Sequence, residues 1–274
     1  MEAEEKYAAL VSALRAMKGV LVAFSGGVDS SLLLAAAKEA QGDRALAVIG
    51  RSASYPAREH EEALAVARHI GARHLTIETL EISNPEYLRN PTNRCFICKS
   101  TLFGSLMELA AKEGLGCVVE GSNADDQQDF RPGMQAARKL GVRAPLMEVG
   151  LTKTEIRALA RARDLAVWDK PSLACLSSRI PYGSAITPQR LARIDRAEEA
   201  IRARGFRQVR VRDHGELARV EVDPESVSRL LDADLRREVV AALKQEGYRY
   251  VALDLEGYRT GSMNEGLTPA ARTR

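Results

Sequence analysis

Residue types that can do chemistry concentrate first in a short polar turn near the start of the chain. The sequence Ser-Gly-Gly-Val-Asp-Ser-Ser occupies residues 25–31, between the apolar run at 19–24 and an alanine- and leucine-rich segment. This order predicts a buried parallel strand, a tight loop and a helix. Glycines let a backbone approach an anion, and a helix N-terminus offers unpaired N–H groups and the positive end of its dipole. The stretch is therefore predicted to bind phosphate.

The side chains of this turn add to the prediction. The hydroxyls of Ser25, Ser30 and Ser31 supply further donors, whereas the carboxylate of Asp29 would repel phosphate unless it holds a metal or caps the helix. Asp29 therefore suggests magnesium. The alternative is a glycine-rich turn before a capped helix with no ligand, which the strand context and the complete motif make less favourable. The pattern lacks the lysine of a Walker P-loop and is not Gly-x-Gly-x-x-Gly.

A second chemical stretch lies far along the chain, between prolines. Residues 169–183 hold one thiol, Cys175, three serines, and the cations Lys170 and Arg179, with neither helical nor strand period. Such loops commonly serve binding or chemistry. Lys170 and Arg179 would favour a thiolate at Cys175 if the loop folds them around it. From composition alone, a linker between two domains is an equal alternative.

Three further cysteines carry a weaker signal. Cys95 and Cys98 have the spacing of a redox pair or of half a metal site, but no second pair lies nearby. Two partly buried thiols at the start of a helix are the alternative. Cys117 lies within an apolar strand and is predicted to be simply buried. Four cysteines in a chain of this size do not indicate a disulfide framework.

The elements that must position these groups alternate between strands and helices. Strands are predicted at residues 19–24, 45–50, 74–78 and 116–120, with a short fifth strand at 143–146, and helices at 7–17, 58–70, 100–113 and 152–163. The last helix begins with a capping box formed by Thr152 and Glu155. This alternation is typical of a doubly wound parallel sheet, in which loops at the carboxyl ends of the strands share one cleft. An adenine would lie at residues 51–56, and Asp125 or Asp126 would hold magnesium.

The pattern changes at residue 187. A helix is predicted at residues 187–204, half-exposed strands at 206–212 and 217–222, a helix at 226–245 and a strand at 250–255. Period two places Arg210 and Arg212 on one strand face, where they would form an anion clamp. We therefore expect an α/β protein with a Rossmann-like doubly wound sheet and a smaller C-terminal α+β domain. The expected parts are residues 1–168, the cysteine-bearing loop 169–186, and residues 187–274 for substrate binding or oligomerisation.

Composition excludes some classes of partner. Lysine and arginine number 40 against 37 for aspartate and glutamate, and the net charge of +3 is too balanced to predict nucleic-acid binding. No run reaches the roughly 18 apolar residues of a membrane span, and the first residues lack the basic-then-apolar pattern of a signal peptide. We expect a soluble, cytoplasmic protein with neither membrane nor nucleic acid as a partner.

Five motifs together resemble the LarE family of the PP-loop ATP pyrophosphatase superfamily. They are the turn at residues 25–30, Arg-Cys-Phe-Ile-Cys-Lys at 94–99, Glu-Gly-Ser-Asn-Ala-Asp-Asp at 120–126, the loop at 170–183, and Gly-Tyr-Arg-Thr-Gly-Ser-Met-Asn at 257–264. The first is shared by the whole superfamily, whereas the cysteine loop and the closing motif are much more specific. The motifs occur in order over nearly the whole chain. Members of the family are ATP-dependent sacrificial sulfur transferases that help to build the nickel-pincer nucleotide cofactor of lactate racemase.

The resemblance implies a two-step reaction on pyridinium-3,5-biscarboxylic acid mononucleotide. ATP adenylates a substrate carboxylate, and a cysteine thiolate then displaces AMP as a thioester. Cleavage of the Cβ–S bond leaves a thiocarboxylate on the substrate and dehydroalanine on the enzyme. The family also implies a homo-oligomer, expected to be a hexamer, and companion proteins that make the biscarboxylate and insert nickel.

Motifs and resemblance together assign roles to individual residues. The expected catalytic residues are Cys175 as sulfur donor, Asp29, Ser178 and Arg179. The expected ATP-binding residues are Phe24, Ser25, Gly26, Gly27, Asp29, Ser30, Gly50, Ser52, Gly121 and Asp125. The substrate phosphate would be bound by Arg210, Arg212, Arg259 and Ser262, and Mg²⁺ by Asp29 and Asp125.

Three alternatives stay open. A [4Fe-4S] cluster on Cys95, Cys98 and Cys175 could carry the sulfur, although the cysteine loop offers one thiol, with Ser177 and Ser178 where further ligands would stand. A tRNA-thiolating enzyme would need a large basic surface. A non-enzymatic adenine-nucleotide-binding module would bind ATP without releasing pyrophosphate.

Overall fold

The chain forms two compact units. The computed structural model describes residues 2–128, 132–171, 174–259 and 261–262. One unit, called unit 1, comprises Met1–Glu81 and Asn93–Leu173, and unit 2 comprises Ile82–Thr92 and Ala174–Arg274. The short segment Ile82–Thr92 thus belongs to the unit formed mainly by the C-terminal third of the chain. The division into three functional parts, with boundaries after residues 168 and 186, stays a prediction.

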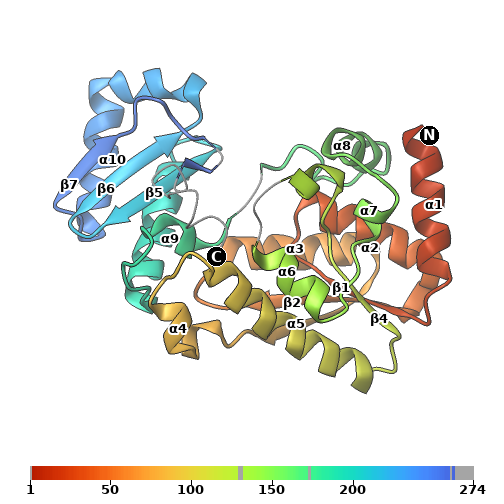
Figure 1. Ribbon diagram of the computed structural model, residues 1–274. Coiled ribbons are helices and arrows are strands. Elements are labelled where there is room, and N and C mark those ends of the chain that lie inside the picture. The colour runs from red at the N-terminus through yellow and green to blue at the C-terminus, as the bar shows by residue number, and fades with distance from the viewer. Residues whose placement is uncertain (1, 129–131, 172–173, 260, 263–274) are drawn as a thin grey trace. The chain divides into compact units, whose positions relative to one another are not determined.

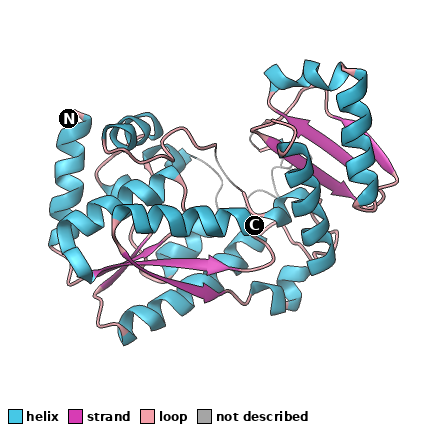
Figure 2. Cartoon of the chain, turned by 180° about the vertical axis from the view of Figure 1, so that it is seen from behind, coloured by secondary structure: helices cyan, strands magenta, loops and turns pink. Residues whose placement is uncertain are grey.

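Unit 1 is built on a parallel sheet with helices on both faces (Figures 1 and 2). Its strands are β1 Val20–Ala23, β2 Ala45–Arg51, β3 Arg73–Glu78 and β4 Cys117–Val119, in the order β3-β2-β1-β4. Its helices are α1 Ala3–Arg15, α2 Val28–Gln41, α3 Ala57–Ile70, α5 Arg94–Lys112, α6 Pro132–Lys139, α7 Pro145–Glu148 and α8 Lys153–Ala162. The predicted α/β, Rossmann-like fold is confirmed.

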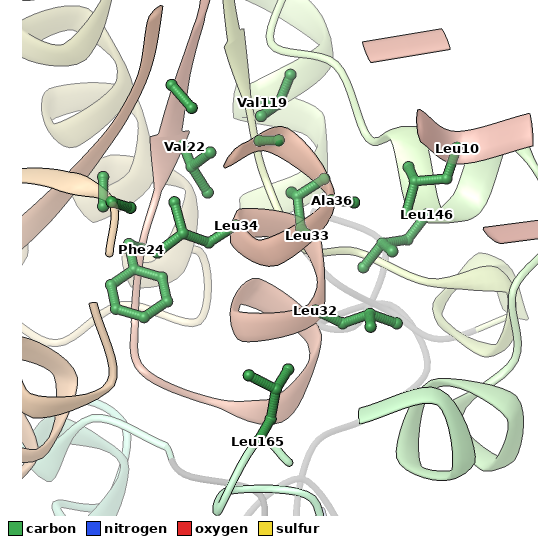
Figure 3. Close-up of a cluster of buried hydrophobic side chains, with 14 of the residues drawn as sticks. Leu10, Val22, Phe24, Leu32, Leu33, Leu34, Ala36, Val119, Leu146 and Leu165 are labelled. Atoms are coloured by element: carbon green, nitrogen blue, oxygen red, sulfur yellow. The ribbon is translucent and has the colours of Figure 1, made fainter. Parts of the chain in front are cut away.

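The central strand β1 is buried on both faces, because successive side chains of a strand point to opposite sides. Val20 and Val22 join the core cluster that includes Leu33 of α2, whereas Leu21 joins a second cluster that includes Phe103 of α5. Figure 3 shows the first of these clusters, with leucines of α2 beside the strand. Burial on both faces explains the continuous apolar run that predicted this strand.

Unit 2 carries a small mixed sheet. Its elements are α4 Pro85–Leu88, α9 Pro188–Arg202, β5 Val209–His214, β6 Leu217–Val222, α10 Ala233–Gln245 and β7 Tyr250–Leu253. Strands β5 and β6 are antiparallel, and β6 and β7 are parallel. The hydroxyl of Thr187 caps α9 by accepting from the N–H of Arg190 at 3.2 Å. The second, smaller α+β fold expected from the sequence is present.

Two predicted elements are wrong. Residues 143–146 form no strand: Arg143 makes one isolated bridge to Val119, and α7 starts at Pro145, which has no N–H to continue a ladder. The helix predicted at residues 226–245 is broken, because a 3-10 segment runs over Pro224–Leu231 before α10. Asp232 causes the break by capping α10, where its carboxylate accepts from the N–H groups of Asp234 and Leu235.

Two further expectations need correction. Helix α5 begins at Arg94, not near residue 100, so Cys95 and Cys98 lie inside its first turns. Strand β5 is buried along residues 209–213 and is not half exposed. Its arginines are buried because carboxylate and aromatic groups of unit 2 surround them, a partnership that a period-two pattern cannot reveal. Among the described residues, no helix combines the length and apolarity needed to cross a membrane.

The start of α8 shows how helix ends are fixed in unit 1. The predicted capping box is present: the carboxylate of Glu155 accepts from the N–H of Thr152 at 2.8 Å, and Thr152 Oγ1 accepts from the N–H of Glu155. Lys6 of α1 pairs with the same carboxylate at 2.7 Å. The hydrogen bond from Lys6, followed by that from the Thr152 backbone, lowers the pKa of Glu155 to about 2.

This ion pair predicts a pH-dependent contribution to stability. A carboxyl whose pKa is lowered by folding stabilises the protein above its unfolded pKa, and the contribution is lost as the pH falls through the folded pKa. Glu155→Gln should therefore be less stable than wild type at neutral pH, and the difference should shrink between about pH 4.5 and about pH 2. The fluorescence of Trp168, the chain's single tryptophan, follows urea unfolding of unit 1. Glu148→Gln, at an exposed ion pair, is the control; a difference constant over this range would contradict the prediction.

Candidate functional site

The predicted phosphate loop lies at the carboxyl end of β1. Phe24 continues the ladder, since its N–H donates to the carbonyl of Val48 at 2.9 Å, and its side chain is buried in the core. Gly26 has φ of 70°, and a Cβ at this position would lie 2.7 Å from the Cβ of Ala63, so only glycine fits. Gly27 is the N-cap of α2 and brings no side chain to the first N–H groups. Those groups are left for an anion.

The serines of the loop differ in their surroundings. Ser30 is buried and donates to the carbonyl of Gly27 at 3.1 Å, which shapes the turn. Ser25 is exposed, 3.1 Å from the hydroxyl of Ser30. Ser31 is fully buried, and its hydroxyl has no hydrogen-bond partner within the described part of the chain. Ser25 is therefore the hydroxyl of this loop best placed to meet a ligand from solvent.

The loop after β4 meets the start of α2. Strand β1 lies between β2 and β4, so the strand order reverses beside β1, and ligands of such sheets bind at that reversal. A Cβ at Gly121 would lie 3.0 Å from the backbone nitrogen of Ser30. Glycine at this position therefore lets the two loops lie close together. The buried side chain of Asn123 donates to Asp29 Oδ1 at 3.1 Å. The structure thus joins the first and third motifs.

A lysine that sequence reasoning missed completes this constellation. Nζ of Lys153 lies 2.5 Å from Asp29 Oδ2, and its backbone N–H donates to Asp125 Oδ2 at 2.8 Å. Lys153 is the first residue of α8, so the cap read from Thr152 located the helix start but not this side chain. The side chain carried no signal of its own in the sequence, because Asp29 and Asp125 come from other parts of the chain. Its cation lies beside the predicted phosphate site.

The loop after β2 is held by a buried carboxylate. Ser52 Oγ donates to Glu81 Oε1 at 2.5 Å, and Ser54 Oγ donates to the same oxygen at 2.7 Å. Glu81 is buried. At Gly50 a Cβ would lie 2.9 Å from Thr79 Cγ2, so the strand end is tightly packed. The hydroxyl of Ser52 is thus engaged by protein, and a role of Gly50 and Ser52 in binding ATP stays a prediction.

In unit 2, Cys175 opens a short turn. We use the name cysteine turn for Cys175 and the 3-10 turn Leu176–Arg179. Cys175 is partly exposed, whereas Arg179 is completely buried. The guanidinium of Arg179 donates to the carbonyls of Ala174 and Cys175, at 2.5 and 2.9 Å, and to Ser178 Oγ at 3.1 Å. Arg179 therefore shapes the backbone that presents the thiol.

Glu198 of α9 neutralises this buried cation. Its two carboxylate oxygens accept from Nε and Nη2 of Arg179 at 2.8 and 2.9 Å, and Oε1 also accepts from the N–H of Val211 at 3.1 Å. Burial alone would raise the pKa of Glu198, but the charge and hydrogen bonds of Arg179 lower it to about 2. Both groups are therefore charged at neutral pH. Glu198 was missed because it lies in an ordinary charged helix in the sequence.

Two predicted phosphate ligands meet beside the cysteine turn. Arg212 pairs with Glu221 at 2.6 Å and donates to the carbonyl of Ser178 and to Ser262 Oγ, each at 3.2 Å. The structure thus brings Ser178, Arg212 and Ser262 together. Arg212 is buried with its charge balanced by Glu221.

The other two predicted ligands have different partners. Arg210 is buried, and its guanidinium carbon lies 5.0 Å from the ring centroid of Tyr258. Burial, followed by repulsion from Arg179, lowers the pKa of Arg210 to about 10. Arg259 pairs with Glu256 at 2.9 Å and faces Asp254 at 3.9 Å.

The remaining motif residues are spread over unit 1. Lys170 forms ion pairs at 2.7 Å with Glu59 and with Glu62 of α3. Cys95 is exposed and Cys98 partly buried on α5, and burial raises the pKa of the partly buried Cys117. No group of three or more His, Cys, Asp or Glu side chains that could hold a metal occurs among the residues described. Ser172, Leu173, Thr260, Met263 and Asn264 of the quoted motifs lie outside the described residues.

Comparison with known proteins decides the family. The family model for asparagine synthase matches residues 5–111. The chain is 37% identical over 267 residues to pyridinium-3,5-bisthiocarboxylic acid mononucleotide synthase of Lactiplantibacillus plantarum, covering 97% of this chain and 96% of that protein. The chain belongs to this synthase family, the LarE family. It is also 44% identical over 248 residues to an uncharacterized protein of Synechocystis, covering 90% of this chain and 92% of that one, and 26% identical over 243 residues to an uncharacterized protein of Methanocaldococcus jannaschii, covering 89% and 92%.

The buried ion pair of this LarE-family chain yields a stability prediction. Arg179→Met leaves Glu198 buried without its main cation, which typically costs about 3–5 kcal/mol of unfolding free energy. Arg196→Met is the matched control on the same helix as Glu198, because its ion pair with Glu246 is exposed and should contribute about 1 kcal/mol or less. Urea unfolding followed by circular dichroism measures both. Equal stabilities of the two variants would show that the buried pair does not hold unit 2 together.

Proposed function

We propose that this protein is an ATP-dependent sulfur transferase that converts the carboxylates of pyridinium-3,5-biscarboxylic acid mononucleotide to thiocarboxylates, with the sulfur of Cys175. The observation that carries the proposal is the identity of 37% over nearly the whole chain to a synthase named for the bisthiocarboxylate product. The partly exposed thiol of Cys175, on a turn fixed by a buried arginine, supports it.

The first step uses the groups of unit 1. An oxygen of the substrate carboxylate attacks the α-phosphorus of ATP, the bond from that phosphorus to the bridging oxygen breaks, and pyrophosphate leaves. The first N–H groups of α2, the hydroxyl of Ser25 and the ammonium of Lys153 would hold the phosphates. Lys153 would then exchange Asp29 for phosphate, which releases the carboxylate.

Asp29 and Asp125 fit a magnesium ion. Mg²⁺ takes oxygen ligands and is usually held by one or two carboxylates together with substrate phosphates and water. Asp29 is partly exposed, and both carboxylates contact Lys153 at one place in the fold. When bound there, the ion would neutralise charge that develops on the leaving pyrophosphate.

The second step uses the cysteine turn. The thiolate of Cys175 attacks the acyl carbon of the adenylate, AMP leaves, and a thioester forms. Loss of the Cα proton of Cys175 and cleavage of its Cβ–S bond then release the thiocarboxylate and leave dehydroalanine. Arg179 binds the carbonyl of Cys175 and would thereby hold the thiol in place for this attack. Arg210, Arg212, Ser262 and Arg259 are proposed to bind the substrate phosphate.

The setting of the reaction is part of the proposal. One chain donates one sulfur, so two chains would be consumed for each bisthiocarboxylate made. Four free cysteines and the use of ATP suit a reducing cytoplasm. We also propose a homo-oligomer, a hexamer in view of the family resemblance, that acts between a carboxylase and a nickel-inserting protein.

Intact-mass spectrometry after reaction tests this function. With ATP, Mg²⁺ and the biscarboxylate nucleotide, the protein should lose the mass of one hydrogen sulfide, located at Cys175, and pyrophosphate should form. Cys175→Ala should keep its mass and still release pyrophosphate once. Thiocarboxylate formed by a protein of unchanged mass would overturn the sacrificial route. Loss of activity in Cys95→Ser would then favour a [4Fe-4S] carrier on Cys95, Cys98 and Cys175.

Lys153 gives a second test, restricted to the first step. Lys153→Met should lower substrate-dependent pyrophosphate release about 100-fold, because it removes a cation that stabilises charge on the phosphates. Lys139→Met is the control in unit 1, since Lys139 packs over the ring of Phe96; its rate should match wild type. A Lys153 variant with the wild-type rate would exclude this role.

A further inference from the structure

Some side chains that bind the cysteine turn lie outside it in the sequence, and the proposed reaction gives them no role. They belong to Ile82–Thr92, the only early segment assigned to unit 2 among the described residues. Within it, Asn84 caps α4 by accepting from the N–H of Glu86 at 2.9 Å. The segment therefore has a defined start and presents Tyr87 and Asn90 to the later part of unit 2.

Tyr87 binds the turn through its hydroxyl group. Its phenolic oxygen lies 2.7 Å from Ser177 Oγ, across a sequence separation of 90 residues. Tyr87 is 1% exposed and Ser177 0% exposed, so water does not replace either group. Ser177 is two residues from Cys175, inside the turn that Cys175 opens. The hydroxyl of Tyr87 thus holds the turn at Ser177, whereas Arg179 holds it at the carbonyls of Ala174 and Cys175.

Asn90 holds the residues that follow the turn. Its side-chain nitrogen donates to the carbonyls of Ile180, Pro181 and Ser184, at 3.2, 2.8 and 3.1 Å. Its own carbonyl accepts from the N–H of Gly183 at 2.9 Å. The backbone of Asn90 has φ of 58°, a left-handed conformation that asparagine tolerates better than most residues. An asparagine is therefore suited to this position for both its backbone and its amide.

We propose that Tyr87 and Asn90 are positioning residues for Cys175: they fix the turn that presents the thiol and thereby control sulfur transfer, but not adenylation. The proposal rests on the proposed function. A nucleophile displaced by about 1 Å from its attack position can lose about 100-fold in rate. Both residues belong to unit 2 and bind the cysteine turn and the residues after it, whereas the phosphate loop belongs to unit 1, so pyrophosphate release should not depend on them.

Single-turnover experiments on the full chain separate the two steps. Tyr87→Phe removes one hydroxyl and keeps the ring; Asn90→Gly removes the amide and keeps the left-handed backbone. After mixing with ATP, Mg²⁺ and the biscarboxylate nucleotide, pyrophosphate and intact mass are followed in time. Each variant should release pyrophosphate within about twofold of wild type and lose sulfur about tenfold or more slowly. Equal slowing of both steps, or of neither, would overturn the proposal.

Matched control variants distinguish positioning of the cysteine turn from a general loss of packing in the protein. Tyr248→Phe removes a buried hydroxyl of unit 2 that donates to Asp213 at 3.1 Å, and Asp164→Gly replaces another residue with positive φ, 53°, in unit 1. Both should transfer sulfur at the wild-type rate; slowing by Tyr248→Phe equal to that by Tyr87→Phe would refute positioning.

A double variant tests whether the two hydroxyls act as one bond. Tyr87→Phe with Ser177→Ala should be no slower than Tyr87→Phe alone, because both changes remove the same interaction. If the double variant were slowed by the product of the two single effects, the two hydroxyls would not act as one bond. Wild-type protein that releases no pyrophosphate at all would instead contradict the proposed function, so the two failures are distinguishable.

Discussion

The buried ion pair of Arg179 and Glu198 is the interaction on which the cysteine turn depends. Burying two charges is costly, and it is tolerated only where geometry is good and the remaining donors and acceptors are bonded. Here the guanidinium is bound in a bidentate manner by the carboxylate and also donates to Ser178 and to the carbonyls of Ala174 and Cys175. One cation therefore connects the turn to α9, and the carboxylate connects α9 to β5 through Val211.

Two ion pairs beside the groups of the proposed reaction differ in exposure. The side chains of Arg179 and Glu198 are 0% exposed, whereas those of Lys153 and Asp29 are 30% and 22% exposed. A pair in contact with water can exchange partners, because the solvent compensates each charge as it moves. A fully buried pair cannot. The partly exposed pair of Lys153 and Asp29 suits a site that must admit a charged nucleotide. The buried pair of Arg179 and Glu198 suits a scaffold that must hold one thiol in place.

Much of the fold follows from local sequence signals, but the partners of the charged residues do not. The apolar run at residues 19–24, the glycines after it and the Thr152–Glu155 box predicted β1, its loop and the start of α8, because periodicity and capping act between near neighbours. Arg143 resembled part of a strand, yet Pro145 starts a helix there. Arg210 and Arg212 were expected on one face of a half-exposed strand but are buried, because the carboxylate of Glu221 and the ring of Tyr258 become their neighbours only in the folded unit. For the same reason the bonds of Tyr87, Asn90 and Lys153 had no signal in the sequence.

The backbone of the cysteine turn is suited to a residue that loses its thiol. Among the described residues, the side chain of Cys175 makes no capping hydrogen bond, and the turn is held through the carbonyl of Cys175, which binds Arg179 and the N–H of Ser178. In the proposed reaction the Cβ–S bond and the Cα proton are lost, while this carbonyl is retained. The bonds from Tyr87, Asn90 and Glu198 also end on groups that the reaction does not alter. It follows that the spent protein would keep the turn folded, so that sulfur loss would alter the chemistry of residue 175 without unfolding unit 2.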